Sequence, residues 1–167
     1  TPVSDIFRTV GFLDVKEKDE QEGLLNRTPV IIPAAGEDPA LKKFLNGKPK
    51  AMLEIKGKTL LNRQIETLNA NGLSDIFVVA GYGRDQMQIT GATVLENKNY
   101  KDSSMLHSIF SAKNEMTNGF IMLYSDILLE DDILAKLLRC HEDIVLVVDN
   151  AVQYHRIEAG KMVDFVI

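Results

Sequence analysis

The 167-residue sequence predicts an α/β fold of Rossmann-like type, with a mixed, mainly parallel sheet and helices on both faces. Short β-branched runs alternate along the chain with segments whose apolar residues recur at helical spacing. The composition, 45% hydrophobic and 26% charged, is that of a globular chain long enough to bury a core. In sheets of this kind ligands bind beyond the carboxyl ends of the strands, so we expect the site in the loops that follow them.

The individual elements are predicted from Thr28 onward. Apolar and β-branched runs indicate strands at Val30–Ile32, Ile76–Ala80, Thr93–Leu95, Phe120–Tyr124 and Ile144–Val148. Apolar residues three or four positions apart indicate helices at Leu60–Asn71, Arg84–Ile89, Ser103–Met116 and Asp131–Arg139. Because these strands and helices alternate, the connections are of the βαβ kind, which pairs strands in parallel.

The two ends of the sequence differ from its middle. In residues 1–27 a short apolar stretch precedes a charged one, which predicts a docking helix followed by a solvated linker. The last residues indicate a strand pair, Gln153–Glu158 and Met162–Ile167. Since such an edge normally has more sheet beside it, we expect residues 28–167 to form a domain that is incomplete at its C-terminus.

Composition excludes several classes of function. The net charge is -5 and lysine and arginine form no dense stripe, which disfavours nucleic-acid binding. The sequence has no apolar run of the roughly 20 residues that a membrane span needs, and its N-terminus is not a signal peptide. Cys140 is the only cysteine, so an intramolecular disulfide is impossible. These features predict a cytoplasmic protein, and they leave a homo-oligomer open.

Two short motifs are candidates for phosphate chemistry. Ala34, Ala35 and Gly36 follow the first strand, where small residues allow backbone N–H groups to approach a phosphate or a base closely. Lys50 comes after Pro49 and can reach phosphates and offset developing charge. Taken alone, the loop of small residues is also explained by an ordinary tight turn, and Lys50 by a solvent-exposed surface lysine. Their combination in this order is more specific to nucleotide binding.

The stretch from Val30 to Asp132 resembles the superfamily of sugar-phosphate and choline-phosphate nucleotidyltransferases, which includes the MobA-like proteins. The matching residues are Ala34-Ala35-Gly36, Pro49-Lys50, Gly81-Tyr82 and Asp126 within Tyr124-Ser125-Asp126-Ile127. Residues 96–108 are most similar to cytidylyltransferases that act on phosphocholine or aminoethylphosphonate. Residues 2–13 resemble the C-terminal tail of phosphoenolpyruvate mutase, which implies the second domain of a mutase fusion.

The resemblance implies a fold of the nucleotide-diphospho-sugar transferase type and a reaction. A phosphonate or phosphate such as 2-aminoethylphosphonate would take CMP from CTP, releasing pyrophosphate, in phosphonate biosynthesis. Lys50 and Asp126 would be the catalytic residues, with Asp126 binding Mg²⁺. The nucleotide would be contacted by Lys50 and by small or polar residues of the loops: Ala34, Ala35, Gly36, Gly81, Asn97 and Ser104.

One loop departs from the family pattern and keeps alternatives open. The family usually has glycine and arginine where this sequence has Asp38 and Ala40, so Lys42, Lys43 or Lys48 would have to replace the arginine clamp. A second metal-binding acid has no match in this sequence. The alternatives are a sugar-1-phosphate nucleotidyltransferase that uses UTP, GTP or dTTP, and a non-catalytic nucleotide-binding or assembly module.

Overall fold

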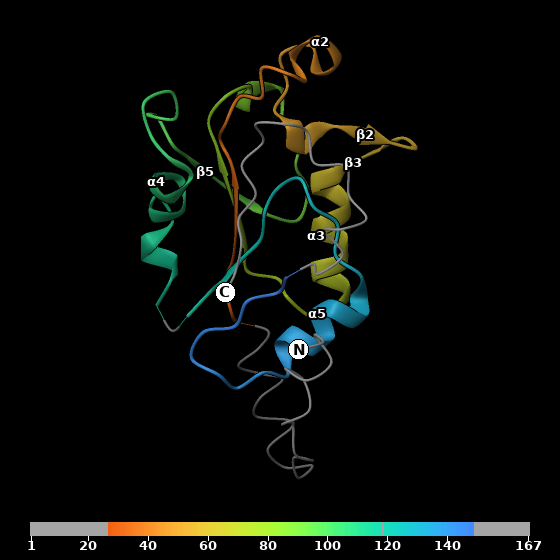
Figure 1. The fold of residues 1–167 in the computed structure, drawn as a ribbon, viewed down its shortest axis with the longest axis vertical. Coiled ribbons are helices and arrows are strands. Elements are labelled where there is room, and N and C mark those ends of the chain that lie inside the picture. Colours follow the sequence, from red (N-terminus) through yellow and green to blue (C-terminus); the bar gives the residue numbers. More distant parts are fainter. Residues whose placement is uncertain (1–26, 118, 149–167) are drawn as a thin grey trace.

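The computed structural model describes residues 27–117 and 119–148, and a parallel four-stranded sheet lies at its centre (Figure 1). The sheet has the order β5-β4-β1-β6. Its strands are β1 (Val30–Ala34), β4 (Ile76–Ala80), β5 (Thr93–Glu96) and β6 (Ile121–Met122). The chain moves outward from β1 to β5 and then returns to the other side of β1. Strand order therefore reverses between β1 and β6, and the predicted fold class is confirmed.

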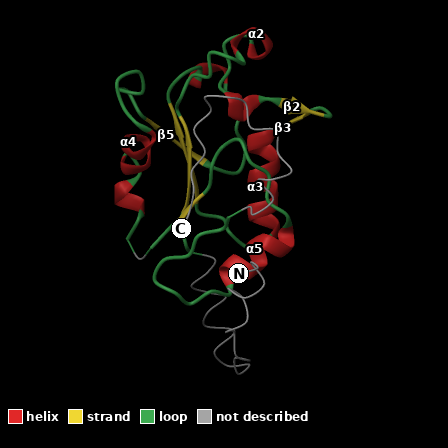
Figure 2. Cartoon of the chain, in the orientation of Figure 1, coloured by secondary structure: helices red, strands yellow, loops and turns green. Residues whose placement is uncertain are grey.

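Helices cover both faces of the sheet (Figures 1 and 2). α3 (Leu60–Ala70) and α5 (Asp131–Leu138) lie on one side, and α4 (Met105–Phe110) lies on the other. The hydroxyl of Thr59 accepts a hydrogen bond from the N–H of Asn62 and so caps the first turn of α3.

In the described ranges no helix combines the length and the apolar composition needed to cross a bilayer.

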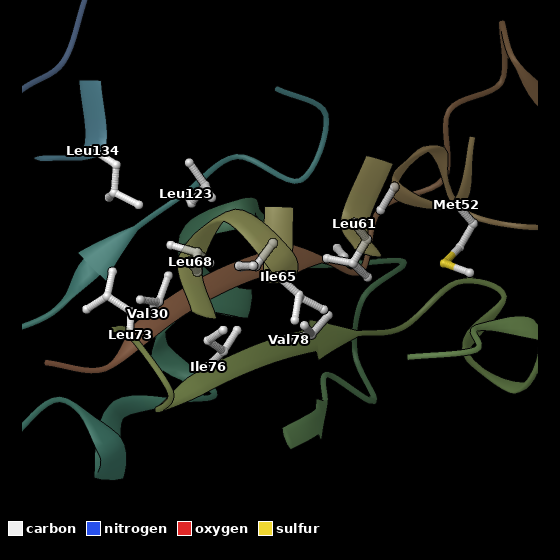
Figure 3. Close-up of a cluster of buried hydrophobic side chains, with 13 residues drawn as sticks. Val30, Met52, Leu61, Ile65, Leu68, Leu73, Ile76, Val78, Leu123 and Leu134 are labelled. Atoms are coloured by element: carbon white, nitrogen blue, oxygen red, sulfur yellow. The ribbon is translucent and has the colours of Figure 1, made fainter. Parts of the chain in front are cut away.

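The main core fills the space between α3 and the sheet (Figure 3). Side chains alternate along a strand, so β1 and β4 each send every second residue toward α3. Full burial of an aliphatic side chain of this kind contributes roughly 1.5–3 kcal/mol. The central members of this cluster are fully or almost fully buried: Val30, Ile32, Leu61, Ile65, Leu68, Ile76 and Val78. A smaller cluster around Ile31, Val79 and Ala112 lies on the opposite face.

A hairpin and a short helix connect β1 to α3. β2 (Glu54–Ile55) pairs with β3 (Lys58–Thr59) in antiparallel fashion. The two turn residues, Lys56 and Gly57, both have positive φ, at 51° and 76°, as a type I′ turn requires. α2 (Lys42–Leu45), which the sequence did not predict, precedes this hairpin.

Three predicted elements are shorter than expected by more than one residue. The helix predicted over Ser103–Met116 consists of α4 followed by a 3₁₀ turn, η4 (Lys113–Glu115). After α4 the backbone changes to i→i+3 hydrogen bonds, such as the one from the N–H of Ala112 to the carbonyl of Ile109. The helix predicted over Arg84–Ile89 is one 3₁₀ turn, η3 (Arg84–Gln86). The strand expected over Phe120–Tyr124 retains only the two residues of β6 that pair with β1.

The strand predicted at Ile144–Val148 is wrong, because these residues have no regular secondary structure. Ile144, Leu146 and Val147 are exposed, and this segment pairs with none of the strands in the described part of the chain. The predicted strand pair 153–167 and the predicted N-terminal docking helix lie outside the described residues.

Candidate active site

A cavity of about 490 Å³ opens at the carboxyl ends of β1 and β6. This is the place where strand order reverses, which is where ligands bind in open α/β sheets. Four segments that are distant in sequence surround it. They contribute residues 33–38, residues 49–51, Tyr100 with Ser103, Ser104, Met105 and Ser108, and residues 124–126.

Lys50 and Asp126 meet at this cavity. The Nζ atom of Lys50 lies 2.7 Å from Oδ2 of Asp126, although the two residues are 76 positions apart. Lys50 begins the 3₁₀ turn η2 (Lys50–Met52), and Asp126 lies in the loop after β6. Both side chains are more than a third exposed, so water screens the pair. Because both groups are accessible, each can leave the ion pair. Lys50 can then contact a negatively charged group of a ligand, and Asp126 can contact a cation.

Backbone and small side chains form the floor of the cavity. Ala34, Ala35 and Gly36 all line it, as the sequence predicted for a loop that approaches a ligand closely. The carbonyl of Ala35 accepts a hydrogen bond from the N–H of Tyr82, which ties this loop to the one after β4. Among the described residues, no atom outside Gly36 and its two chain neighbours lies within 4 Å of the place where Gly36 would carry a Cβ, so the space there is open.

The two acids of the altered loop have partners within the protein. Asp38 accepts hydrogen bonds from the N–H groups of Ala40 and Leu41 and so caps the turn before α2. Glu37 lies 2.9 Å from the ammonium group of Lys42. The hydrogen bond from Lys42 is the main reason that the pKa of Glu37 is lowered, and the same bond raises the pKa of Lys42. The charge of Glu37 at the cavity is therefore offset by Lys42.

The lysines suggested as a replacement clamp lie outside the cavity. Lys42 is paired with Glu37, and Lys48 lies 3.8 Å from Glu54. Neither of them nor Lys43 is among the residues that line the cavity, whereas Lys50 is. Among the described lysines, Lys50 is thus the one best placed to meet a phosphate there.

Gln64 is a residue of the site that sequence reasoning missed. It lies on α3, is 2% exposed, and its Nε2 donates to the carbonyls of Tyr124 and Ile127. These carbonyls flank Asp126 in the chain, so one buried carboxamide holds the loop that carries the carboxylate. The signal was present in the sequence, because Gln64 stands at a helical position between the core residues Leu61 and Leu68.

Two predicted nucleotide contacts lie behind the cavity wall. Asn97 is 2% exposed and does not line the cavity, whereas Ser104 does. Gly81 does not line it either. A Cβ on Gly81 would lie 2.7 Å from Cβ of Tyr100 and 2.9 Å from the carbonyl oxygen of Ala35. Gly81 therefore allows the two walls of the cavity to approach each other.

This packing predicts the effect of Gly81→Ala. The added methyl group has to displace either Tyr100 or the loop at Ala35, so the free energy of unfolding should fall by about 1–3 kcal/mol. Urea denaturation measures this change. Gly36→Ala is the matched control, because open space surrounds that position, and its stability should stay within about 0.5 kcal/mol of the wild type. Equal stability of the two variants would contradict the packing argument.

The donor groups fit a magnesium ion that shares its coordination with a ligand. Mg²⁺ prefers oxygen ligands and is commonly held by one or two carboxylates together with phosphate oxygens and waters. Asp126 presents such a carboxylate to the cavity. Among the described residues, no three His, Cys, Asp or Glu side chains come together as a metal cluster. A site built from protein ligands alone is therefore not formed by these residues.

Comparisons with known proteins agree with this geometry. The chain is 32% identical over 132 residues to a CTP:phosphoglutamine cytidylyltransferase from Campylobacter jejuni, covering 72% of this chain and 52% of the relative. It is 30% identical over 96 residues to a choline-phosphate cytidylyltransferase from Streptococcus pneumoniae, covering 55% of this chain and 42% of the relative. The chain thus spans about half the length of the curated relatives it matches.

A solved structure and a family model also match this chain. The structure of CTP:phosphocholine cytidylyltransferase (LicC) from Streptococcus pneumoniae superposes with a TM-score of 0.55 at 30% identity. The match covers 60% of this chain and 45% of that one. The sequence model of the MobA-like NTP transferase domain matches residues 30–160, which is most of the chain. The protein therefore belongs to the MobA-like NTP transferase domain family.

Proposed function

We propose that this chain is the nucleotide-binding part of a Mg²⁺-dependent cytidylyltransferase. It would transfer CMP from CTP to a phosphorylated or phosphonylated small molecule, such as 2-aminoethylphosphonate. The observation that carries the proposal is the contact of Lys50 with Asp126 at a cavity on the strand-order reversal. Further support comes from two relatives whose names describe CTP-dependent transfer to phosphorylated molecules.

The proposed reaction is an in-line substitution at the α-phosphorus of CTP. An oxygen of the acceptor's phosphate or phosphonate forms the new bond, and the bond to the bridging oxygen of pyrophosphate breaks. Such a reaction needs positioning and charge neutralisation more than a covalent nucleophile. Mg²⁺, when bound with the nucleotide, neutralises charge on the phosphate oxygens.

The residues that line the cavity would bind and position the reacting groups. The Lys50 ammonium group would leave Asp126 and hold an oxygen of the triphosphate or of the attacking group. The Asp126 carboxylate would then be available as a metal ligand, held in place by the loop that Gln64 supports. The loop at Ala34, Ala35 and Gly36 would pack against the nucleoside and its phosphates.

The acceptor is proposed from the sequence. Residues 2–13 resemble the tail of phosphoenolpyruvate mutase, and a mutase product leads to phosphonates. A fusion of the two domains would place CMP transfer next to phosphonate formation, with the linker of residues 1–27 between them.

Thermal protection tests the proposal. A ligand that binds only the folded state at a hundredfold excess over its Kd stabilises it by about 2.7 kcal/mol. We expect Mg²⁺ with CTP to raise the Tm selectively over Mg²⁺ with UTP, GTP or ATP. The shift should disappear in Lys50→Ala and in Asp126→Ala.

Each other outcome has a defined meaning. Selective protection by UTP or GTP would replace the cytidylyltransferase by a sugar-1-phosphate nucleotidyltransferase. Protection by CTP without turnover in the whole protein would indicate a nucleotide-binding module. Absence of protection by any nucleotide would contradict a nucleotide site in this chain.

A further inference from the structure

Asn97 is the centre of a buried hydrogen-bond network behind the cavity. Its Nδ2 donates to Oγ of Ser103 at 2.9 Å and to Oγ of Ser108 at 3.0 Å. Its Oδ1 accepts from the N–H of Asn99 at 3.0 Å. A backbone N–H can only donate, so the atom facing Asn99 must be the carboxamide oxygen. The NH₂ group therefore faces the two serines, and both of its hydrogens are used.

This arrangement fixes the polarity of the two hydroxyl groups. A serine hydroxyl has one hydrogen to donate and lone pairs to accept with. Because Ser103 and Ser108 both accept from Asn97, neither can give its own hydrogen to that residue. Both serines line the cavity, and the described residues give neither hydroxyl a further acceptor. Their two O–H groups are thus left as donors for whatever enters the cavity.

We propose that Asn97 is a positioning residue that orients Ser103 and Ser108 as paired hydrogen-bond donors to an acceptor oxygen of the bound nucleotide. The proposal rests on the proposed function, since it assumes that the nucleotide occupies this cavity. It assigns Asn97 a role one layer behind the ligand, in agreement with its 2% exposure. Ser108, at 5% exposure, presents its hydroxyl in a largely dry environment, where a hydrogen bond to a charged group is strongest.

Reversing the polarity of the carboxamide tests the proposal. Asn97→Asp has almost the same shape, but its carboxylate can only accept, so it would take both serine hydrogens away from the cavity. We expect the Kd for CTP with Mg²⁺, measured by calorimetry, to rise at least about tenfold. Asn99→Asp is the matched control. It adds the same charge two positions away on an exposed side chain and should leave the Kd within about twofold.

Asn97→Asp could weaken binding either by turning the serine hydroxyls away from the cavity or by repulsion between the introduced carboxylate and the nucleotide. A double-mutant cycle separates these two causes. Ser103→Ala with Ser108→Ala should raise the Kd in the wild-type background, but it should add little in the Asn97→Asp background, where the hydroxyls already point away. Equal further loss in both backgrounds would overturn the proposal, as would an unchanged Kd in the serine double variant. That double variant also decides the matter if Asn97→Asp fails to fold.

The same series of variants identifies which oxygen of the nucleotide accepts the hydrogen bonds from the two serines. Binding of tripolyphosphate with Mg²⁺ should weaken together with CTP binding if the acceptor is a phosphate oxygen, and CTP binding alone should weaken if it belongs to the nucleoside. Failure of the wild type to bind CTP at all would instead contradict the proposed function, so the two failures are distinguishable.

Discussion

Asp126→Asn is expected to lower kcat/KM for CMP transfer by roughly a thousandfold in the whole protein, with little loss of stability. The lost charge is the one that would hold the metal, and metal-ion stabilisation of a phosphoryl transition state is worth several kcal/mol. By contrast, the pair with Lys50 is exposed enough to contribute only about 0–1 kcal/mol to folding. Pyrophosphate release and urea denaturation measure the two effects on the same variant.

A second ion pair of equal length serves as the control. Lys58 and Glu66 are also 2.7 Å apart but do not line the active-site cavity. Glu66→Gln should therefore leave turnover unchanged while having a similarly small effect on stability. If Asp126→Asn kept wild-type turnover at saturating Mg²⁺, the metal-binding role of Asp126 would be refuted.

The central strands were predictable because their side chains are buried on both faces. β4 lies where the apolar run Ile76–Ala80 placed it. β1, however, continues through Pro33 to Ala34, two residues further than predicted. Leu123 donates its N–H to the carbonyl of Ile31, so odd-numbered residues of β1 face β6. Pro33, which has no N–H, faces the same side after β6 has ended, so the missing donor costs no ladder bond.

The helix over Ser103–Met116 shows what apolar spacing cannot decide. The spacing indicated one face and one continuous helix, but Leu106 and Phe110 are exposed while Ile109 and Ala112 are buried. Ala112, which follows α4, packs against Ile31 and Val79 on the sheet. That contact joins residues far apart in sequence, and local periodicity carries no information about it.

The site was predictable to the level of its loops. Resemblance placed Lys50 and Asp126 after different elements, and the parallel sheet explains why such loops meet at one edge. It did not distinguish residues that line the cavity, such as Ser104, from residues that support its wall, such as Asn97 and Gly81. That distinction depends on side-chain direction in three dimensions, which a motif does not contain.

The largest expected effect on stability is that of Gln64→Glu. Gln64 donates both hydrogens of its buried carboxamide to the carbonyls of Tyr124 and Ile127. A carboxylate of the same size would face those oxygens with negative charge and no hydrogen to donate. We expect the free energy of unfolding at pH 7 to fall by about 3 kcal/mol, and protection by CTP to be lost with it because the Asp126 loop is displaced.

The pH dependence identifies the cause of that loss. Burial beside two carbonyls raises the pKa of the introduced carboxyl in the folded state above its unfolded value of about 4.3. Between these two pKa values the folded protein binds more protons than the unfolded one, so stability relative to the wild type falls as pH rises. The difference from wild type should therefore shrink on acidification, when the protonated carboxyl can donate one hydrogen bond.

Gln64→Met provides the comparison. It removes both hydrogen bonds together with Oε1, which has no partner among the described residues, and it introduces no charge. Its free energy of unfolding should fall by about 1–3 kcal/mol, and this loss should be independent of pH because the two carbonyls stay unpaired at every pH. A gap between the two variants that widens as pH rises would show that the side chain at position 64 lies buried against the two carbonyls of the Asp126 loop. Equal losses in the two variants across the pH range would contradict that placement.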